Sequence, residues 1–204
     1  IKMELIHSYK SVDDGYFKLF MTNCNIIYKD VYEDICKYVY KSDIETVNSR
    51  NVGLFTNDKS KIGESFCLKW KHTPTRYIYQ SFTPMLDRLL DIVSPLYDKH
   101  TLTDAIVNVY NEGDFISYHK DYHSVEREPC SIVFSFEQDE NESHTMDFYR
   151  TTGENWSMKK DKGKNREEFS IKLPNHSISV MVGMQRKYAH SVKPGKKRIS
   201  VVFR

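Results

Sequence analysis

The chain lacks the cysteine pattern of a disulfide-stapled or zinc-bound protein. Its four cysteines, Cys24, Cys36, Cys67 and Cys130, lie far apart and form no Cys-x-x-Cys pair. This spacing argues against a zinc knuckle and against the disulfide framework of a small secreted protein. We therefore expect mostly buried thiols and a reducing, intracellular location in the cytoplasm or nucleus.

Long hydrophobic runs and a strong net charge are missing as well. No apolar stretch approaches the ~18 residues that a membrane-spanning helix needs. The N-terminus lacks the apolar core of a signal peptide, so we expect no membrane association. The net charge is only +2, although 28% of the residues are charged. The whole chain is therefore not a polybasic nucleic-acid binder, while a local basic groove stays compatible with its composition.

Aromatic side chains, in contrast, are abundant. They make up 13% of the chain, with 14 tyrosines and 11 phenylalanines, and such a content favours strands over helices. The 204 residues suit one domain with a real core. Within this single domain, 1–204, we expect a helical N-terminal part over about 1–103 and a jelly-roll core over 104–204.

Two helices are predicted in the first part. Apolar residues that recur every four positions predict a helix over roughly 30–41. A second helix follows Thr83 and Pro84, because threonine can cap a helix and proline suits its first turn. Pro95 should end or kink this second helix.

The pattern changes to short strands after residue 104. Six segments are rich in β-branched or aromatic residues and are bounded by glycine, proline, asparagine or charge clusters. They are residues 104–110, 130–136, 145–149, 169–173, 178–184 and 198–203. Helices followed by many short strands predict an α+β chain that ends in a β-sandwich or jelly roll. Residues 150–168 are polar and predict a surface loop.

A His-x-Asp motif suggests a metal site. In an extended strand the side chains of His119 and Asp121 point to the same side, so both can reach one ion. His190 is the best candidate for a third ligand, and two histidines with one carboxylate form the facial triad of non-haem iron(II) oxygenases. Polar surface residues at a strand end would explain the same motif without a metal.

The last strand carries two arginines on one face. Arg198, Ser200, Val202 and Arg204 alternate with apolar residues. Arginines that point into a sheet interior need anionic partners, and a guanidinium binds a carboxylate through two parallel hydrogen bonds. Both arginines could bind one dicarboxylate, or one could bind it while the other braces the site. An edge strand with exposed basic residues is the alternative.

Four motifs thus follow one another along the chain: Asn108-Val109-Tyr110, His119-Lys120-Asp121, His190 and Arg198-x-Ser200-x-Val202-x-Arg204. In this order and local spacing they resemble the AlkB family of nucleic-acid dealkylases, over about residues 66–204. The resemblance implies a double-stranded β-helix, a jelly roll of the cupin-like kind. It also implies a nucleotide-recognition lid before that core.

The resemblance also assigns roles to the motif residues. It implies that Fe(II) is bound by His119, Asp121 and His190, and that Arg198 pairs with the distal carboxylate of 2-oxoglutarate. The other end of 2-oxoglutarate would be surrounded by Asn108, Tyr110, Ser200 and Arg204. Serine at position 200 departs from the more common asparagine but still supplies a hydrogen-bonding group.

The segment 70–79 resembles the nucleotide-recognition lid of that family. Trp70 falls where the lid carries a base-stacking aromatic, and Tyr77 where it carries a phosphate-contacting tyrosine, with Arg76 beside them. A flipped base needs flat apolar faces around it, which suits this assignment. Trp70 could equally be a core aromatic. His123 stands where several members carry a base-reading acidic residue, so the substrate base stays open.

The resemblance implies an enzyme that uses Fe(II), 2-oxoglutarate and O2 to remove methyl groups from N-alkylated bases of DNA or RNA, with release of formaldehyde. We expect methylated DNA or RNA as the substrate and a monomeric protein. The basic run over 159–166 could grip a nucleic-acid strand or form a solvated loop. Two alternatives stay open: a protein hydroxylase or demethylase of the same fold, and a non-enzymatic module that binds RNA or DNA.

Overall fold

The structure is a computed structural model of the chain. It describes residues 1–11, 15–41, 48–70, 73–97, 102–121, 130–152, 158–163 and 166–204, with the backbone alone for 41, 48–49, 66–70 and 73–76.

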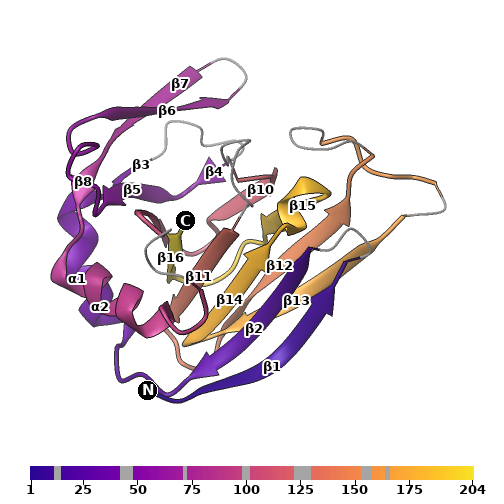
Figure 1. Ribbon diagram of the computed structural model, residues 1–204, viewed down its shortest axis with the longest axis horizontal. Coiled ribbons are helices and arrows are strands. Elements are labelled where there is room, and N and C mark those ends of the chain that lie inside the picture. Colours follow the sequence, from indigo (N-terminus) through magenta and orange to yellow (C-terminus); the bar gives the residue numbers. More distant parts are fainter. Residues whose placement is uncertain are drawn as a thin grey trace.

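The larger of two main sheets contains nine strands within these residues. They are β1 (Met3–Lys10), β2 (Tyr16–Thr22), β3 (Tyr40–Lys41), β5 (Asn51–Thr56), β8 (Gln80–Ser81), β9 (Asp104–Tyr110), β11 (Cys130–Glu137), β14 (Ser177–Val182) and β16 (Arg198–Phe203). Their order is β1-β2-β14-β11-β16-β9-β5-β3, with β8 beside β5. The strand β16 therefore lies in the interior of the sheet, between β11 and β9 (Figure 1).

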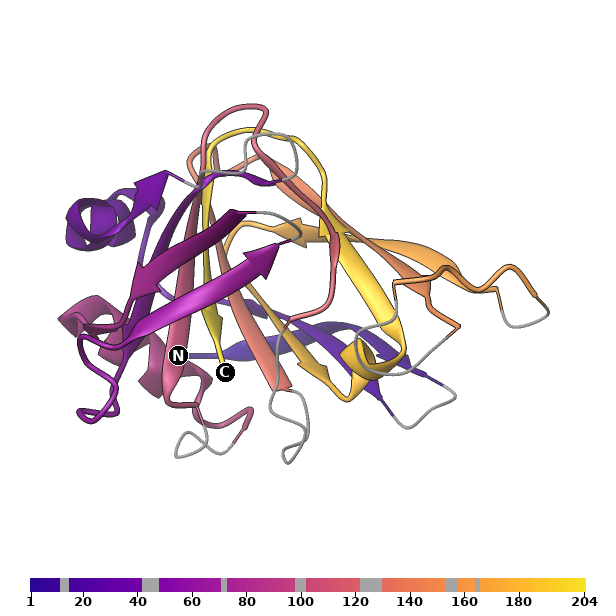
Figure 2. The same ribbon diagram turned by 90° about the horizontal axis from the view of Figure 1, so that it is seen from above.

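The second sheet contains five strands: β4 (Asn48–Ser49), β10 (Phe115–His119), β12 (Ser143–Arg150), β13 (Glu168–Pro174) and β15 (Tyr188–Val192). Its order is β13-β12-β15-β10-β4. A separate hairpin pairs β6 (Ser65–Trp70) with β7 (Thr73–Ile78). This hairpin lies at the same end of the long axis as the helices, opposite β12, β13 and β15 (Figures 1 and 2).

The two sheets enclose a hydrophobic cluster between their inner faces. The larger sheet contributes Phe17, Leu19, Val133 and Met181, and the smaller one contributes Met146, Phe148, Ile171 and Val192. Alternation along each strand sends every second side chain into this space. The result is a β-sandwich of the jelly-roll kind, whose interior also receives the polar side chains of the candidate site.

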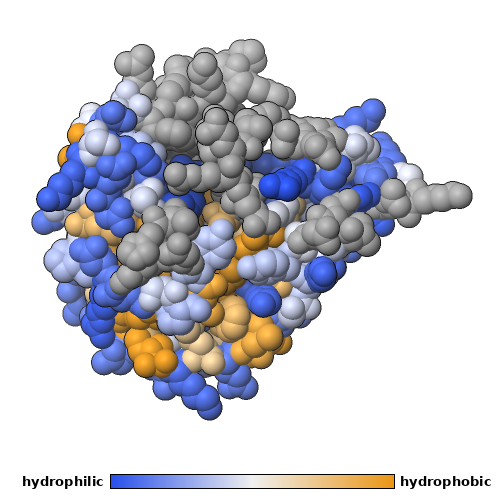
Figure 3. All heavy atoms as spheres, viewed as in Figure 1, coloured by the Kyte–Doolittle hydropathy of each residue, from blue (hydrophilic) through white to orange (hydrophobic). Residues whose placement is uncertain are grey.

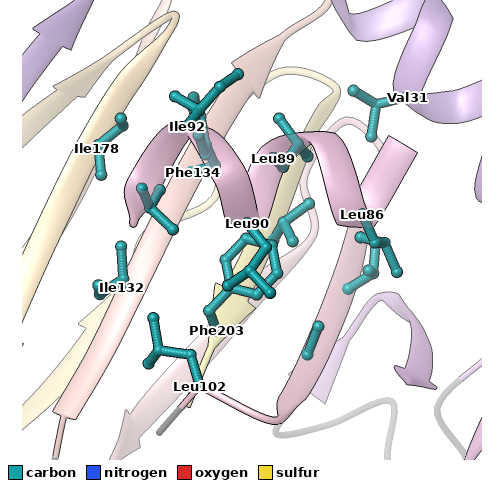
Figure 4. Close-up of a cluster of buried hydrophobic side chains, with 14 of the residues drawn as sticks. Val31, Leu86, Leu89, Leu90, Ile92, Leu102, Ile132, Phe134, Ile178 and Phe203 are labelled. Atoms are coloured by element: carbon teal, nitrogen blue, oxygen red, sulfur yellow. The ribbon is translucent and has the colours of Figure 1, made fainter. Parts of the chain in front are cut away.

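Two helices cover the outer face of the larger sheet, α1 (Tyr28–Ile35) and α2 (Pro84–Val93). The Thr83 hydroxyl accepts a hydrogen bond from the backbone N–H of Leu86 at 3.3 Å, and proline opens the helix. The apolar face of α2 packs on β11 and β16, where Leu89 and Leu90 lie close to Phe203 (Figure 4). Burial of each such side chain contributes about 1.5–3 kcal/mol.

The predicted strands of the second half are present, and two of them, 104–110 and 198–203, have the expected bounds. The expectation of a mainly helical part before them is wrong for the described residues. The segment up to residue 103 holds α1, α2 and eight strands, so the fold is mostly β. The helix predicted over 30–41 ends at Ile35 and continues as one 3-10 turn, Cys36–Tyr38.

Surface and thiols complete the description. Hydrophobic residues gather in the middle and lower part of the face seen in Figure 3, and hydrophilic residues form much of its margin. Cys24 and Cys130 are buried, and Cys36 is exposed. Within the described part of the chain, none of the helices has the length and apolar character required to cross a membrane.

Candidate metal centre

The strand pair β10–β15 brings two histidines together. His119 is the last residue of β10 and lies directly opposite His190 in the middle of β15. The pairing contains an irregularity. Ile116 opposes Val192 and His119 opposes His190, so three steps along β10 correspond to only two steps along β15. This extra residue is a β-bulge, which re-aims the side chains that follow it. Without it, Tyr118 would face His190.

Asp121 follows the strand and joins the two histidines. Its carboxylate oxygens lie 3.6 Å from Nε2 of His119 and 3.9 Å from Nε2 of His190. One ligand atom from each residue lies within 4.8 Å of the other two. Two imidazoles and one carboxylate at this spacing suit a divalent iron, and they leave other coordination positions open for further ligands. The side chains of His119 and Asp121 are 21% and 17% exposed and His190 is 4% exposed, so the three form a largely enclosed cluster.

Two polar side chains that sequence reasoning missed hold Asp121 in place. Gln185 donates from Nε2 to Oδ2 of Asp121 at 2.6 Å and accepts from the Asp121 backbone N–H. The Ser131 hydroxyl donates to the same oxygen at 3.2 Å. Gln185 lies in a one-turn 3-10 helix that follows Gly183, whose φ of 67° favours glycine. No sequence motif marks either residue, because their contacts form only through the fold.

Lys120 points away from its two motif neighbours. Its ammonium donates to the Thr151 hydroxyl and to the Arg186 carbonyl, both at 2.9 Å. Burial, aided by the charge of Lys187, lowers the pKa of Lys120 to about 8. The residue between the two candidate ligands therefore anchors the end of β10 to β12 and to the loop before β15.

Arg198 is buried in the sandwich with unsatisfied donors. It is 1% exposed, and its guanidinium lies 4.7 Å from the centre of the Tyr110 ring. Among the residues that the structure describes, nothing accepts a hydrogen bond from its Nε or Nη1. A buried cation of this kind needs an anionic partner, and a guanidinium binds a carboxylate through charge-assisted hydrogen bonds. The edge-strand alternative is wrong, because β16 is an interior strand.

Asn108 and Ser200 lie next to Arg198 on the neighbouring positions of β9 and β16. Asn108 donates from Nδ2 to the Ser200 hydroxyl at 3.1 Å. Its carbonyl oxygen accepts from Nε of Arg50 at 2.7 Å. Arg50 was not predicted, because a lone arginine between two short strands carries no sequence signal. The structure thus brings together Asn108, Tyr110, Arg198 and Ser200, as the resemblance implied.

Arg204, at the far end of the same strand face, has other neighbours. It exchanges two backbone hydrogen bonds with Asp104, and its charge lies close enough to Tyr79 to lower the pKa of that phenol. Burial and the Asp104 carboxylate outweigh this effect and raise the pKa of Tyr79 to about 12. The expected place of Arg204 in the same pocket as Asn108 therefore stays a prediction. The arginine that the structure places on Asn108 is Arg50.

The predicted lid residues have different outcomes. Tyr77 is 6% exposed and packs in a cluster with Val52, Leu54 and Tyr79, and its expected contact with a phosphate stays a prediction. Trp70, expected to stack on a base, and Arg76, expected beside it, lie on the β6–β7 hairpin, and the structure describes only their backbone. His123 lies outside the described residues.

The basic run after β12 is partly neutralised by acidic neighbours. Lys160 and Arg166 both form ion pairs with Glu168, at 2.6 and 2.8 Å. Arg150 pairs with Asp161 at 3.4 Å. These pairs favour the solvated-loop interpretation over a nucleic-acid grip for the described part of this segment.

Comparisons with known proteins agree with this site. Residues 34–204 match the family model described as the 2OG-Fe(II) oxygenase superfamily. No curated protein matches the chain significantly. Similar solved structures include a Pseudomonas putida prolyl-4-hydroxylase, with TM-score 0.51, 12% identity and coverage of 86% of this chain and 82% of that chain. OsALKBH1 also has TM-score 0.51 and 12% identity, with 99% and 97% covered. At this identity both likenesses show the fold alone.

Proposed function

Because the chain belongs to the 2OG-Fe(II) oxygenase superfamily, we propose that His119, Asp121 and His190 hold its iron and that Arg198 holds its 2-oxoglutarate. The protein is a 2-oxoglutarate-dependent dioxygenase, and its cofactors are Fe(II) and 2-oxoglutarate with O2. Bound iron and 2-oxoglutarate supply the oxidative chemistry, in which 2-oxoglutarate is decarboxylated to succinate while a substrate C–H bond is hydroxylated.

The unsatisfied guanidinium of Arg198 is the observation that carries the co-substrate assignment. Nε and Nη1 point into the sandwich interior with no acceptor among the described residues. Buried guanidinium donors that lack a hydrogen-bond acceptor cost several kcal/mol, and an anionic ligand that accepts from them would offset this cost. A carboxylate of 2-oxoglutarate is the anion that the family requires.

The other residues of the site would orient the metal ligand Asp121 and exclude water. Gln185 and Ser131 fix one oxygen of Asp121, so the carboxylate keeps one rotamer toward the histidines. Tyr110 covers the Arg198 guanidinium with its ring, which keeps water from that face. These contacts place the reacting partners in a fixed, water-poor space, where positioning contributes most to rate.

The substrate class in this proposal is nucleic acid with N-alkylated bases. The support is the set of motifs around the iron and 2-oxoglutarate positions, which resembles the AlkB family in order and spacing. Hydroxylation of an N-methyl group gives a product that releases formaldehyde and the unmethylated base. Trp70 on the β6–β7 hairpin is the residue that we assign to stacking on the flipped base.

A protein side chain is the alternative substrate. The prolyl-4-hydroxylase from Pseudomonas putida has the same TM-score as OsALKBH1, so the fold favours neither. Tyr77, which was expected to contact phosphate, is only 6% exposed, and this burial favours the protein substrate. The iron and 2-oxoglutarate positions would be the same in both cases.

One experiment separates these substrates. The Fe(II)-loaded protein is incubated with 2-oxoglutarate and a panel of methylated DNA and RNA oligonucleotides, and in parallel with a proline- and lysine-rich peptide library. We expect mass spectrometry to show methyl loss from an oligonucleotide, dependent on 2-oxoglutarate and absent in His119→Ala. Oxidation of peptides with untouched oligonucleotides would replace the proposal by the protein substrate.

A further inference from the structure

A second buried charge lies beside Arg198 and belongs to none of the roles above. Glu137 on β11 directly opposes Arg198 on β16, and the two residues are 2% and 1% exposed. Opposed side chains of antiparallel strands have Cβ atoms ~4.5–5.5 Å apart and lie on the same face. A carboxylate and a guanidinium at such positions are within reach of an ion pair.

These two charges nevertheless form no ion pair. Nε and Nη1 of Arg198 and Oε1 of Glu137 are all buried without a hydrogen-bond partner among the described residues. In a low-dielectric interior the attraction between them is strong, so something must hold the carboxylate back. The neighbouring contacts of Glu137 identify what does so.

His144 holds Glu137 from the opposite sheet. Its Nδ1 lies 2.9 Å from Oε2 of Glu137, and both side chains are almost fully buried, at 2% and 0% exposed. Because a carboxylate only accepts, we assign the shared proton to Nδ1, which then donates. The bond joins β12 to β11 across the sandwich, next to the strand that carries Arg198.

Two neighbours of the His144 ring restrict its position. Its centre is 6.2 Å from that of the Tyr110 ring, which itself covers Arg198. Gly195, in the turn before β16, also lies against the ring. A Cβ at that position would lie only 2.7 Å from Nε2 of His144, so glycine leaves the room that the ring occupies.

We propose that His144 is a positioning residue: its hydrogen bond keeps the Glu137 carboxylate off Arg198, so that the guanidinium stays open to the carboxylate of 2-oxoglutarate. The inference rests on the proposed assignment of Arg198 to the co-substrate. Glu137 at the same time offsets part of the cost of burying Arg198 when the co-substrate is absent. A carboxylate released by His144 would act as an intramolecular competitor at high effective concentration.

The test measures the Kd of 2-oxoglutarate by calorimetry with the Mn(II)-loaded protein under argon. His144→Phe keeps a ring but removes the donor, and we expect it to raise this Kd at least about tenfold, because the released Glu137 pairs with Arg198. The double variant His144→Phe/Glu137→Gln removes the competitor and should restore the Kd to within about threefold of wild type. The Kd of Mn(II) alone should change in neither variant.

A second pair of variants reaches the same hydrogen bond from the turn. Gly195→Ala would clash with the ring at Nε2 and displace it from its position on Glu137, so it should raise the Kd in the same direction, again reversed by Glu137→Gln. Glu137→Gln alone keeps its shape and its bond to His144, so it should bind 2-oxoglutarate at least as tightly as wild type. If the other variants fail to fold, the Kd of Glu137→Gln alone still tests the inference.

Two results overturn the inference. A double variant that binds as weakly as His144→Phe would make His144 a merely structural residue, and weaker binding by Glu137→Gln alone would give Glu137 a direct role. Arg198→Met separates this from the proposed function, because unchanged binding in that variant would reject the assignment of Arg198 itself. If Arg198→Met loses binding while His144→Phe keeps it, only the inference about His144 is wrong.

Discussion

Asp121 depends on residues that lie outside its own motif. Its Oδ2 accepts hydrogen bonds from Gln185 at 2.6 Å and from Ser131 at 3.2 Å, and these donors set the direction of the carboxylate. Groups that orient metal ligands in this way are worth about 10- to 100-fold in metal affinity. In the proposed site, the binding of iron therefore depends on five side chains and not on three.

Removal of the amide should loosen the metal. We expect Gln185→Leu to weaken Mn(II) binding by roughly 10- to 100-fold, because Asp121 loses its strongest donor. The matched control is Gln138→Leu, since Gln138 is an exposed glutamine. Calorimetric titration with Mn(II) measures both, and equal affinities would show that the amide does not support Asp121.

Arg198 allows a test of charge against geometry. In Arg198→Lys the charge is retained but the two-pronged fork is lost, so we expect the Kd of 2-oxoglutarate to rise, and to rise further in Arg198→Met. Loss of a buried charged pair costs about 2–5 kcal/mol, or roughly 30-fold and more in Kd. Arg88→Met, on the exposed side of α2, is the control. An unchanged titration in Arg198→Met would contradict the assignment.

Side chains that share a strand face could be predicted from the sequence, and those that meet only through the fold could not. The alternation along β16 placed Arg198 and Ser200 on one side, and the structure agrees. Gln185 contacts Asp121 and Arg50 contacts Asn108 across 64 and 58 positions of the sequence, and no motif marks either residue. Long-range polar contacts of this kind leave no local periodicity to read.

At the scale of elements, the bulge in β10 decides what the metal motif can do. Spacing predicts that His119 and Asp121 share a side, but it does not say which side. The extra residue between Ile116 and His119 turns both inward and leaves Tyr118 to pack outside on Tyr149, with ring centres 4.6 Å apart. A one-residue shift of this kind reverses every side chain that follows it.

The helix α2 offers an element-level prediction. Leu89 is fully buried against the outer face of the larger sheet, whereas Leu5 on β1 is 51% exposed. We expect Leu89→Ala to lower the free energy of unfolding by about 2–5 kcal/mol, and Leu5→Ala by under about 0.5 kcal/mol. Urea denaturation compares the two, and similar losses would mean that α2 does not pack as described.

The first half of the chain shows where pattern reading failed. The α2 region was predicted because capping, proline and an apolar face coincide. The strands β1 and β2 were missed, although β2 alternates buried and partly exposed residues over Tyr16–Phe20. The strand β1 was missed because it is a mostly exposed edge strand, and its sequence carries no hydrophobic period.

At the scale of the whole molecule, charge limits how nucleic acid could bind. A net charge of +2 gives little long-range attraction, so affinity must come from a few local cations. The sequence around the β6–β7 hairpin provides three of them, Lys69, Lys71 and Arg76. Each phosphate contact contributes a salt dependence of about 0.7–0.9 in the slope of log affinity against log salt.

Salt titration therefore tests the proposed substrate class. We expect a slope of about −2 to −3 for a methylated oligonucleotide, falling toward zero when Lys69, Lys71 and Arg76 are replaced by glutamine. Lys29→Gln on α1 is the control, because its side chain is 73% exposed and does not belong to the hairpin. Fluorescence anisotropy measures the slope, and equal slopes for the triple variant and the wild type would place the nucleic acid elsewhere.

The most direct measurement is a crystal structure of the protein with Mn(II) and 2-oxoglutarate, grown under argon. We predict one metal ion bound by His119, Asp121 and His190, and a 2-oxoglutarate carboxylate on the guanidinium of Arg198, with Glu137 still bonded to His144. A metal ion at other residues, or an Arg198 paired with Glu137 while 2-oxoglutarate binds elsewhere, would contradict the central claim about this site.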